Sequence, residues 1–268
     1  MRLHIVLAAD GPVTVPWDYL QRLHGFLYDA IRRARPRLAH FLHEQGFVVG
    51  SHRYKLLTFS RLFPTRAQGR EDGLILHPPI HWWVSSPLPA PMEALAVSLL
   101  TEGVVILHPH HLLVERLEVE PIPSFDRSVA LETLSPIVVS TGALKNGKLQ
   151  HRFLSPEEED FWRIVQENLK RKAIALWGRA PDPVGLKCYP VGVWKSRLYR
   201  VHKGQVRGYE GKFIAEGAQP WLMLGYEAGF GERNAQGFGM VRIAKDPRTA
   251  SSAPGSERKG TKRIGADG

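Results

Sequence analysis

The chain has 268 residues, of which 43% are apolar and 23% are charged, and Cys188 is its single cysteine. This composition is typical of a globular protein with one large domain or two ordinary ones. No run of 18 apolar residues is present, so we expect no membrane span, and one cysteine excludes both an internal disulfide and a cysteine-based zinc site. Lys and Arg exceed Asp and Glu by ten, which favours a polyanionic partner such as nucleic acid. We expect a cytoplasmic protein.

The first half is predicted to alternate strands and helices. We expect a strand at 2–8, because the N-terminus lacks the long apolar run of a signal peptide. Apolar residues spaced by three and four predict a helix over 17–35, and Pro36 begins a short second helix that stops at Gly46. Further along we expect a strand at 54–60, a loop at 64–69, a strand or hairpin arm at 73–86, a helix at 91–100 and more strands at 104–120. This βαββαβ order is that of a ferredoxin-like fold.

The second half begins after a junction marked by Pro121 and Pro123. We expect a strand at 134–140 and a helix over 155–177 that Ser155 caps. Strands should follow at 185–194, 197–202, 206–214, 220–226 and 238–243. The predicted domains are therefore 1–122 and 123–243, followed by a disordered tail over 244–268, where the composition is rich in Ser, Gly, Lys and Arg.

A glycine-rich stretch, GYEAGFGERNAQGFGM, occupies residues 225–240. It contains no P-loop lysine and fails the dinucleotide-binding fingerprint, so a nucleotide-dependent enzyme is not favoured. We expect the stretch to be a loop between two strands. Its glycines can let the loop pack flat on a helix, or let successive backbone N–H groups bind an anion; the pattern leaves both alternatives open for Gly229, Gly231, Gly237 and Gly239.

Several titratable residues lie in or near the first helical region. His24, Tyr28 and Arg32 recur at intervals of four and share one side of a helix, and His43 and Lys55 follow. A His, a Tyr and a Lys can catalyse proton transfer on an RNA phosphodiester, whose 2′-OH is its own nucleophile. The alternative is a buried Tyr, a His at a helix end and a surface Lys. Five other histidines lack the spacing of a metal site, and we expect them to be structural or exposed: His77, His81, His108, His110 and His111.

Five segments together resemble the CRISPR-associated repeat-processing endoribonucleases of the Cas-six type, in the RAMP superfamily. They are FLYDAI (26–31), LAHFLHEQGF (38–47), KLLTFS (55–60), LSPIVVS (134–140) and LGYEAGFGERNAQGFGMV (224–241). The last is the most specific of them. The resemblance implies an α+β fold of two tandem ferredoxin-like (RRM-like) units, the second with an inserted basic β-hairpin at 195–213.

The resemblance also implies an activity and its residues. The chain would cleave CRISPR repeat RNA without a metal or other cofactor, leaving a 2′,3′-cyclic phosphate and a 5′-hydroxyl. The family's catalytic tyrosine, histidine and lysine fall on Tyr28, His43 and Lys55, with His24 and His40 as alternatives to His43. RNA would be the main partner, with a second copy of the chain and a CRISPR effector complex left open. The residues expected to hold RNA are Lys145, Lys148, Lys187, Lys195, Arg197, Arg200, Lys203, Arg207 and Arg233.

Overall fold

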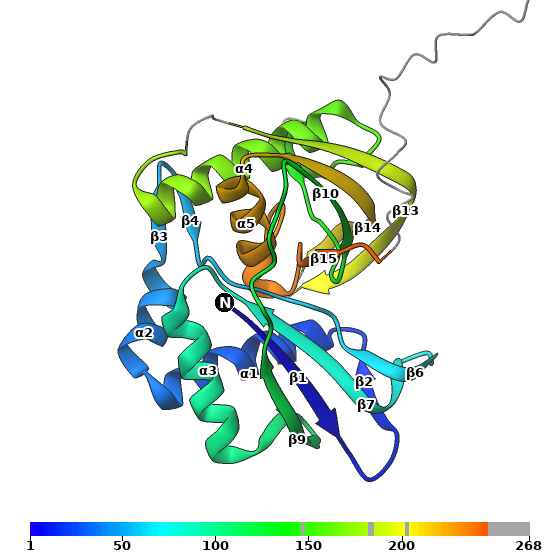
Figure 1. The fold of residues 1–268 in the computed structure, drawn as a ribbon. Coiled ribbons are helices and arrows are strands. Elements are labelled where there is room, and N and C mark those ends of the chain that lie inside the picture. The colour runs from blue at the N-terminus through cyan, green and yellow to red at the C-terminus, as the bar shows by residue number, and fades with distance from the viewer. Residues whose placement is uncertain (146–147, 182–184, 202–203, 246–268) are drawn as a thin grey trace, which may run out of the picture.

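The protein is a mixed α/β structure with antiparallel sheets, seen here in a computed structural model that describes residues 1–145, 148–181, 185–201 and 204–245 (Figure 1). Most of the predicted tail lies outside the described residues. The described beginning of the tail is ordered, because Ala244 is buried and donates its backbone N–H to the Ala130 carbonyl at 2.9 Å.

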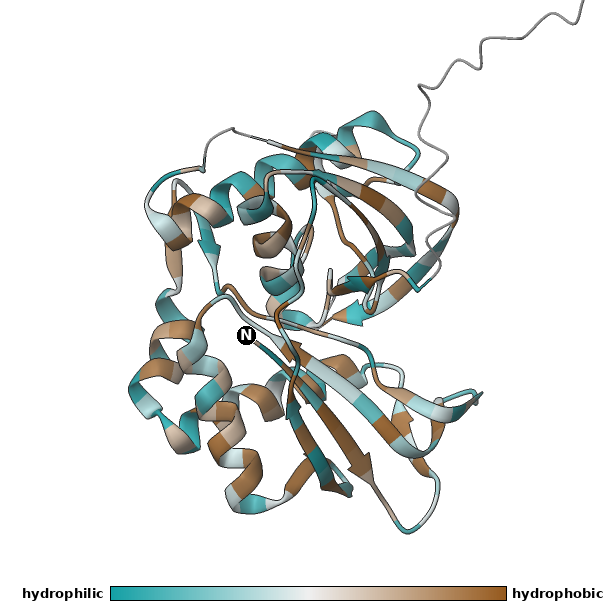
Figure 2. Cartoon of the chain, in the orientation of Figure 1, coloured by the Kyte–Doolittle hydropathy of each residue, from teal (hydrophilic) through white to brown (hydrophobic). Residues whose placement is uncertain are grey.

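The first half forms one antiparallel sheet with strand order β2-β7-β1-β9-β8, and β5 and β6 also pair with β7. Helices α1 and α3 lie side by side against one face of this sheet (Figure 1). The central strand β1 is mostly hydrophobic along its length, as Figure 2 shows, because it is buried among its neighbours. The bounds are β1 Arg2–Ala8, β2 Val13–Pro16, α1 Tyr19–Ala34, β5 Thr58–Phe59, β6 Phe63–Gly69, β7 Gly73–Ser85, α3 Pro89–Glu102, β8 Val104–Leu107 and β9 His110–Val119.

The first helical region forms as predicted. Leu20, Leu23, Leu27 and Ile31 share one face of α1 and are all buried against the sheet. The helix ends before Pro36, which starts the short helix α2 (Pro36–His40). That helix continues through one wide π-helical turn, η1 (Phe41–Gln45), and a small hairpin of β3 (Phe47–Val49) and β4 (His52–Tyr54) follows.

The second half forms a four-stranded sheet with order β13-β14-β10-β15 and a separate hairpin of β11 and β12. Strands β13 and β14 form the long hairpin that contains the predicted basic segment. Helices α4 and α5 contact each other and flank this sheet (Figure 1). The bounds are β10 Ser128–Thr133, β11 Ser140–Lys145, β12 Lys148–Phe153, α4 Glu159–Trp177, β13 Leu186–Val201, β14 Gly204–Gly217, α5 Gln219–Ala228, a 3₁₀ turn η2 Asn234–Gln236 and β15 Val241–Ile243.

Two predicted strands of the second half are wrong. Residues 220–226 belong to helix α5, which Pro220 starts in the first turn and which buries Trp221, Leu222 and Leu224. Residues 134–139 form no strand beyond a single bridge between Ile137 and Tyr209. Both segments are apolar because they are buried, and a short apolar run does not distinguish a strand from a buried helix or an extended core segment.

Other differences are local. The strand expected at 54–60 is interrupted, because Leu56 has a left-handed φ of 50°, which ends regular pairing. The loop expected at 64–69 is instead the edge strand β6, where Pro64 is tolerated. Helix α4 begins at Glu159, not at Ser155, and the Glu158 side chain accepts a hydrogen bond from the Ser155 backbone N–H at 2.8 Å.

The two halves share their packing. Val138 lies in the hydrophobic core of the first half, whereas the adjacent Ile137 and Val139 lie in that of the second. Near the start of the chain, the buried Arg2 guanidinium donates to the Val241 carbonyl at 2.9 Å and to the Tyr226 carbonyl at 2.6 Å. The relative position of the halves is therefore held by both apolar contacts and charged hydrogen bonds.

Candidate active site

Tyr28, His43 and Lys55 come together from three elements: α1, the π-helical turn, and the residue after β4. The Tyr28 and His43 rings meet edge to face, with their centroids 5.5 Å apart and their planes at 83°. The Lys55 ammonium donates a hydrogen bond to the His43 backbone carbonyl at 2.6 Å. The structure thus brings together the three residues that were predicted to be catalytic.

His43 is exposed, and its Nδ1 lies 2.6 Å from Glu44 Oε1. This hydrogen bond is the main cause of the lowered pKa of the Glu44 carboxyl. A carboxylate acceptor at Nδ1 favours a proton on that nitrogen and leaves Nε2 as the ring atom that can exchange a proton with a substrate. The pair therefore presents a histidine in a defined tautomer to the solvent.

Tyr28 is only 9% exposed, and burial raises the pKa of its phenol. Like an ordinary tyrosine, it is protonated at neutral pH and can act as a hydrogen-bond donor, and burial keeps it protonated to a higher pH. Its other ring neighbour is His24, with ring centroids 4.7 Å apart. His24 Nδ1 lies 2.6 Å from the Ala235 carbonyl oxygen, so the glycine-rich loop engages this histidine. His40 is exposed on α2 and lines an adjoining groove with Tyr28 and His43.

Lys55 is held close to the backbone of the turn it contacts. Partial burial is the first cause of its lowered pKa, and the nearby Arg53 lowers that pKa further. Gly46 makes this approach possible: its φ is 61°, and an added Cβ would lie 2.7 Å from the Tyr54 carbonyl oxygen and 3.2 Å from Lys55 Cδ. The sequence indicated Gly46 only as a helix stop, and its role beside Lys55 was missed because that contact depends on the β3–β4 hairpin.

The three residues line a cleft of about 840 Å³ between the two halves. Its first side comes from α1, η1 and β4, and its second from α4, the start of β11 and the glycine-rich loop. On the second side lie Asn168, Arg171, Lys172, Glu232 and Arg233. Of these, only Arg233 was predicted from the sequence, because α4 carries no motif that marks its polar residues as part of a site.

The glycine-rich loop follows helix α5, not a strand, and packs against the first half. Gly237, with a φ of 89°, leaves no room for a side chain, since an added Cβ would lie 2.5 Å from the Phe59 ring and 3.2 Å from Leu20. At Gly237 the loop therefore packs closely on β5 and α1, in line with the packing alternative, while anion binding by its backbone stays a prediction. Lys172 is 2% exposed and donates to the Gly229 and Gly231 carbonyls at 2.7 and 3.0 Å. Its pKa is lowered to about 7, first by burial.

The predicted RNA-binding residues are more scattered. Arg233 is exposed at the cleft, and Arg200 lies at the end of β13 in a smaller pocket that shares His24 with the cleft. Arg197 pairs with Glu210, at 3.1 Å. Lys203 lies outside the described residues. In the part of the chain that is described, the others do not line the cleft. Lys187, Lys195 and Arg207 are exposed on β13 and β14. Lys145 and Lys148 are placed only as the ends of β11 and β12.

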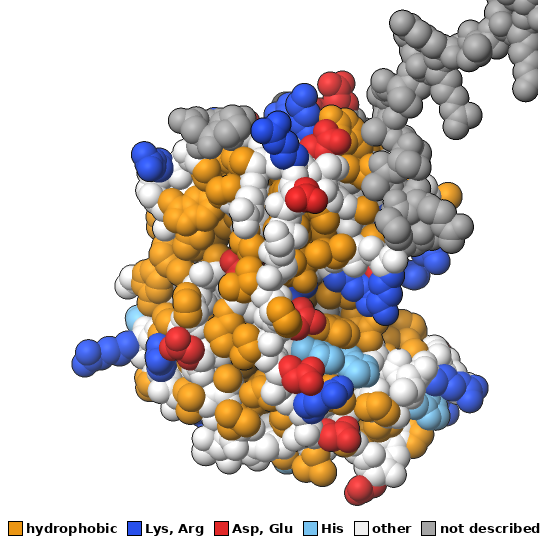
Figure 3. Space-filling view, viewed as in Figure 1, with side chains coloured by type: hydrophobic (Ala, Val, Ile, Leu, Met, Phe, Trp, Pro, Cys, Tyr) orange, Lys and Arg blue, Asp and Glu red, His pale blue; other side chains and the backbone are white. Residues whose placement is uncertain are grey.

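Histidine side chains also gather over the first sheet, on the face seen in Figure 3. There the rings of His4, His81 and Trp83 stack, with His4 and Trp83 centroids 4.5 Å apart. Among the described residues, no three His, Cys, Asp or Glu side chains form a cluster that could hold a metal ion. No helix in the described ranges has the length and apolar content to cross a membrane.

The fold and the site define a class of protein: a two-part antiparallel α/β protein, with a histidine, a tyrosine and a lysine in a cleft closed by a glycine-rich loop. Two family models match it, "CRISPR-associated protein Cas6, N-terminal" over residues 14–118 and "CRISPR associated protein Cas6, C-terminal" over residues 118–243. The chain belongs to the CRISPR-associated Cas6 family.

Relatives and solved structures agree with this family. The chain is 30% identical to the "CRISPR-associated endoribonuclease Cas6" of Pyrococcus furiosus, over 90% of this chain and 88% of the relative. It is 28% identical to "CRISPR-associated endoribonuclease Cas6 1" of Methanocaldococcus jannaschii, over 92% and 94%. A solved structure of "CRISPR associated protein Cas6" superposes with a TM-score of 0.78 at 26% identity, covering 91% of this chain and 99% of that one. "An RAMP protein binding different RNA substrates" shares the fold, with a TM-score of 0.79 at 24% identity over 91% of this chain and 100% of that one.

Proposed function

We propose that this chain is an endoribonuclease that binds CRISPR repeat RNA and cleaves precursor transcripts by attack of the RNA 2′-OH. The observation that carries the proposal is the convergence of Tyr28, His43 and Lys55 in one cleft between the two halves. Membership of the Cas6 family supports it, because relatives at 28–30% identity are named endoribonucleases.

The chemistry needs two proton transfers and a stabilised phosphorane. A base removes the 2′-OH proton, the 2′-oxygen bonds to phosphorus, the bond to the 5′-oxygen breaks, and an acid protonates that oxygen. The products carry a 2′,3′-cyclic phosphate and a 5′-hydroxyl. The nucleophile belongs to the substrate, so the proposed route includes no metal or other cofactor.

Each residue then has a role that suits its surroundings. His43 exchanges a proton through Nε2, because Glu44 lies at its Nδ1. Tyr28, whose hydroxyl is protonated at neutral pH, donates a hydrogen bond that orients the 2′-OH or shares the proton transfer. Lys55 stabilises the charge that develops on the phosphate. His24 and His40 stay alternatives to His43, since His24 contacts the Tyr28 ring and His40 lines the same groove as Tyr28.

Basic residues on the second half would hold the RNA backbone. Among the described members of the predicted set, Arg233 lines the cleft and Arg200 lines the smaller pocket beside it. The basic hairpin of β13 and β14, together with Lys145 and Lys148, would extend this surface, and phosphate contacts of this kind position the RNA more than they specify its sequence. A second copy of the chain and a CRISPR effector complex remain partners to be tested.

We also propose that both halves are ferredoxin-like, with domains at 1–122 and 123–243. The strand orders β9-β1-β7-β6 and β15-β10-β14-β13 support this assignment, because each is the order that a βαββαβ unit gives.

The test is to incubate the protein with the repeat RNA of its own array in EDTA. We expect one cut at a fixed position in each repeat, with a cyclic phosphate and a 5′-hydroxyl identified by mass spectrometry. Tight binding with intact RNA would instead favour the rival function, a non-catalytic RNA-binding subunit of an effector complex. Cleavage that occurs only after Mg²⁺ is restored would overturn the metal-free route.

A further inference from the structure

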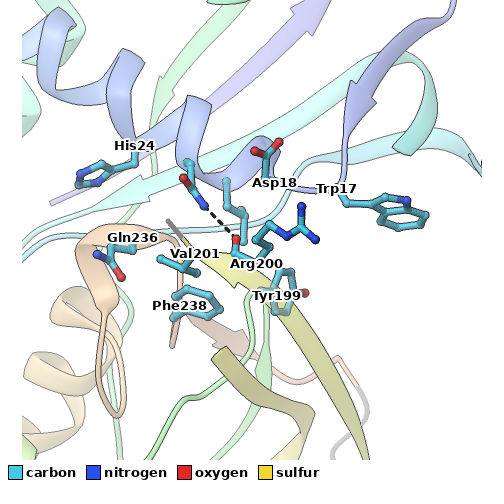
Figure 4. Close-up of a pocket in the computed structure, with 10 residues that line it drawn as sticks. Trp17, Asp18, His24, Tyr199, Arg200, Val201, Gln236 and Phe238 are labelled. Atoms are coloured by element: carbon cyan, nitrogen blue, oxygen red, sulfur yellow. Dashed lines mark hydrogen bonds between the residues drawn. The ribbon is translucent and has the colours of Figure 1, made fainter. Parts of the chain in front are cut away.

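A small pocket with an open mouth lies between the beginning of α1 and the end of β13, with a volume of about 110 Å³ (Figure 4). Its walls are apolar and come from both halves of the chain. The Gln21 side chain donates to the Arg200 carbonyl at 2.9 Å, the dashed line in Figure 4, and so joins α1 to β13 beside the pocket. The apolar wall residues are Leu20, Tyr199, Val201 and Phe238.

This pocket adjoins the candidate active site. His24 and Gln236 line both the pocket and the large cleft, and His24 is in ring contact with Tyr28. The His24–Ala235 hydrogen bond and the η2 turn fix this boundary. When an RNA strand passes Tyr28 and His43, a neighbouring nucleotide can therefore reach the pocket.

The size and lining of the pocket restrict what can fill it. At about 110 Å³ the pocket is smaller than the apolar cavity of about 150 Å³ that holds one benzene molecule, but its mouth is open, so a single six-membered ring can enter it with one edge outside and a fused second ring has no room. Polar groups lie at its edges: the Gln236 amide at one end and the Asp18 carboxylate and Arg200 guanidinium towards the other (Figure 4). A flat ring that carries hydrogen-bonding groups on its rim matches this arrangement.

Charge and aromatic surface at the mouth point to a nucleotide as the source of that ring. Arg200 is exposed and can pair with a phosphate. Beyond it, the Trp17 ring is half exposed and is fixed by a hydrogen bond from its Nε1 to the Glu71 carbonyl, at 3.0 Å. Exposed aromatic rings beside cations are the usual platform for single-stranded nucleic acid.

We propose that this pocket binds one pyrimidine base of the RNA, turned out of the strand next to the nucleotide held by Tyr28 and His43. The proposal rests on the proposed function for the position of the strand. It makes Gln236 and Arg200 specificity-determining residues: the Gln236 amide bonds the edge of the base, and Arg200 bonds its phosphate or its edge.

The test uses short oligomers of 2′-deoxyuridine and of 2′-deoxyadenosine, which lack the nucleophile and cannot be cut. Fluorescence anisotropy should show tighter binding of the deoxyuridine oligomer. Gln236→Ala should weaken that binding by about 5- to 100-fold and remove the preference for it. Gln205→Ala is the matched control, since Gln205 pairs with Arg200 in the hairpin but does not line the pocket. Equal binding of the two oligomers, or a preference that survives both Gln236→Ala and Arg200→Gln, would overturn the proposal.

A second readout locates the base directly. An oligomer with one 4-thio-2′-deoxyuridine should photocrosslink to the peptides that contain Tyr199 or Phe238, and crosslinks confined to other peptides would exclude the pocket. Because the oligomers are not substrates, these results are independent of cleavage. If repeat RNA stays intact while the deoxyuridine preference and its loss in Gln236→Ala are seen, the endoribonuclease assignment fails and the base pocket stands.

Discussion

The rings of Tyr28 and His43 are nearly perpendicular: their planes make an angle of 83°, and their centroids lie 5.5 Å apart. The two members of this pair differ in exposure, because Tyr28 is buried in α1 while His43 is exposed on the π-helical turn. The buried ring therefore fixes one side of the site, and the exposed ring is free to meet a phosphodiester.

His43→Ala should reduce the rate of repeat-RNA cleavage by about 10²- to 10⁴-fold, the usual contribution of a general acid or base, and leave RNA affinity nearly unchanged. Single-turnover cleavage and filter binding on the same variant measure the two effects. His40→Ala is the comparison, because His40 is an exposed histidine of the preceding turn. Normal cutting by His43→Ala would shift the role to His24 or His40.

Tyr28→Phe keeps the buried ring and removes only its hydroxyl, so it should slow cleavage by about 10²-fold with a small change in melting temperature. Tyr28→Ala should instead destabilise the fold by about 3–5 kcal/mol, the usual cost of deleting a buried aromatic ring. Thermal unfolding separates the two variants. Wild-type cleavage rates in Tyr28→Phe would mean that the ring is structural and that the hydroxyl takes no part in the reaction.

The lowered pKa of Lys55 predicts an alkaline limit to activity. A lysine is charged below its pKa, so its stabilising charge is lost as pH rises through a value that lies below the ordinary 10.5. Lys55→Arg should cut more slowly but keep its relative rate to higher pH, because arginine does not lose its charge. Rate–pH profiles, corrected for uncatalysed RNA hydrolysis, show the difference, and identical alkaline limbs would exclude Lys55 as their source.

Lys172 predicts a pH dependence of stability. Its pKa is about 7 in the folded protein against 10.5 for an ordinary lysine, so between these values the unfolded chain binds a proton that the folded chain does not. The free energy of unfolding should therefore rise with pH above about 7, by at most about 1.4 kcal/mol per pH unit, and the penalty should be constant below that pH. Urea unfolding at pH 6 to 9 should show this rise.

Lys172→Met removes the titrating group, and its free energy of unfolding should lose this part of the pH dependence. Lys170→Met is the control, because Lys170 is an exposed residue of the same helix and its removal should leave the slope unchanged. A slope that is equal in wild type and in Lys172→Met would show that other groups account for it.

Replacing each of two glycines of the site region by alanine should change the stability of the protein in opposite directions. Gly237→Ala places a Cβ 2.5 Å from the Phe59 ring at a φ of 89°, so it should destabilise the protein by more than about 1 kcal/mol. Gly25 lies inside α1, and an added Cβ meets no atom within 4 Å, so Gly25→Ala should raise stability by about 0.5–1 kcal/mol. Melting temperatures that move in the same direction would contradict this account.

Sequence patterns predicted the elements that bury a single face, because such burial gives the apolar residues a regular spacing. Helix α1 is the clearest case, since its apolar spacing and Pro36 determine where it lies and ends. The patterns failed at α5 and at 134–139, where apolar residues contact neighbours on several sides and leave no period to detect. Fold class could thus be predicted, as a mixed α/β protein with antiparallel sheets, but not the placement of its most buried segments.

Only part of the candidate site could be predicted from sequence patterns. Spacing alone left His24, Tyr28, His43 and Lys55 undecided between catalysis and chance, and the family resemblance favoured one set. The second side of the cleft was not predicted, because Lys172 on α4 meets the Gly229 and Gly231 carbonyls only after the chain has folded. Contacts between residues nearly 60 positions apart leave no local pattern in a single sequence.

The hydrogen bonds of Arg2 bear on how this protein is made. Its guanidinium is 4% exposed, stacks over the Tyr226 ring at 3.6 Å and finds its acceptors at Tyr226 and Val241. During synthesis on the ribosome, Glu120 of the first half can already approach the Arg2 Nε, from which it lies 3.9 Å away in the folded protein, but both carbonyl acceptors come only with α5 and β15. Without the second half, water takes the place of these carbonyls, so Arg2 is buried and completes its hydrogen bonds only when the second half packs against β1. A nascent chain stalled before residue 226 should therefore be cut by protease near Arg2 more readily than a chain that includes β15.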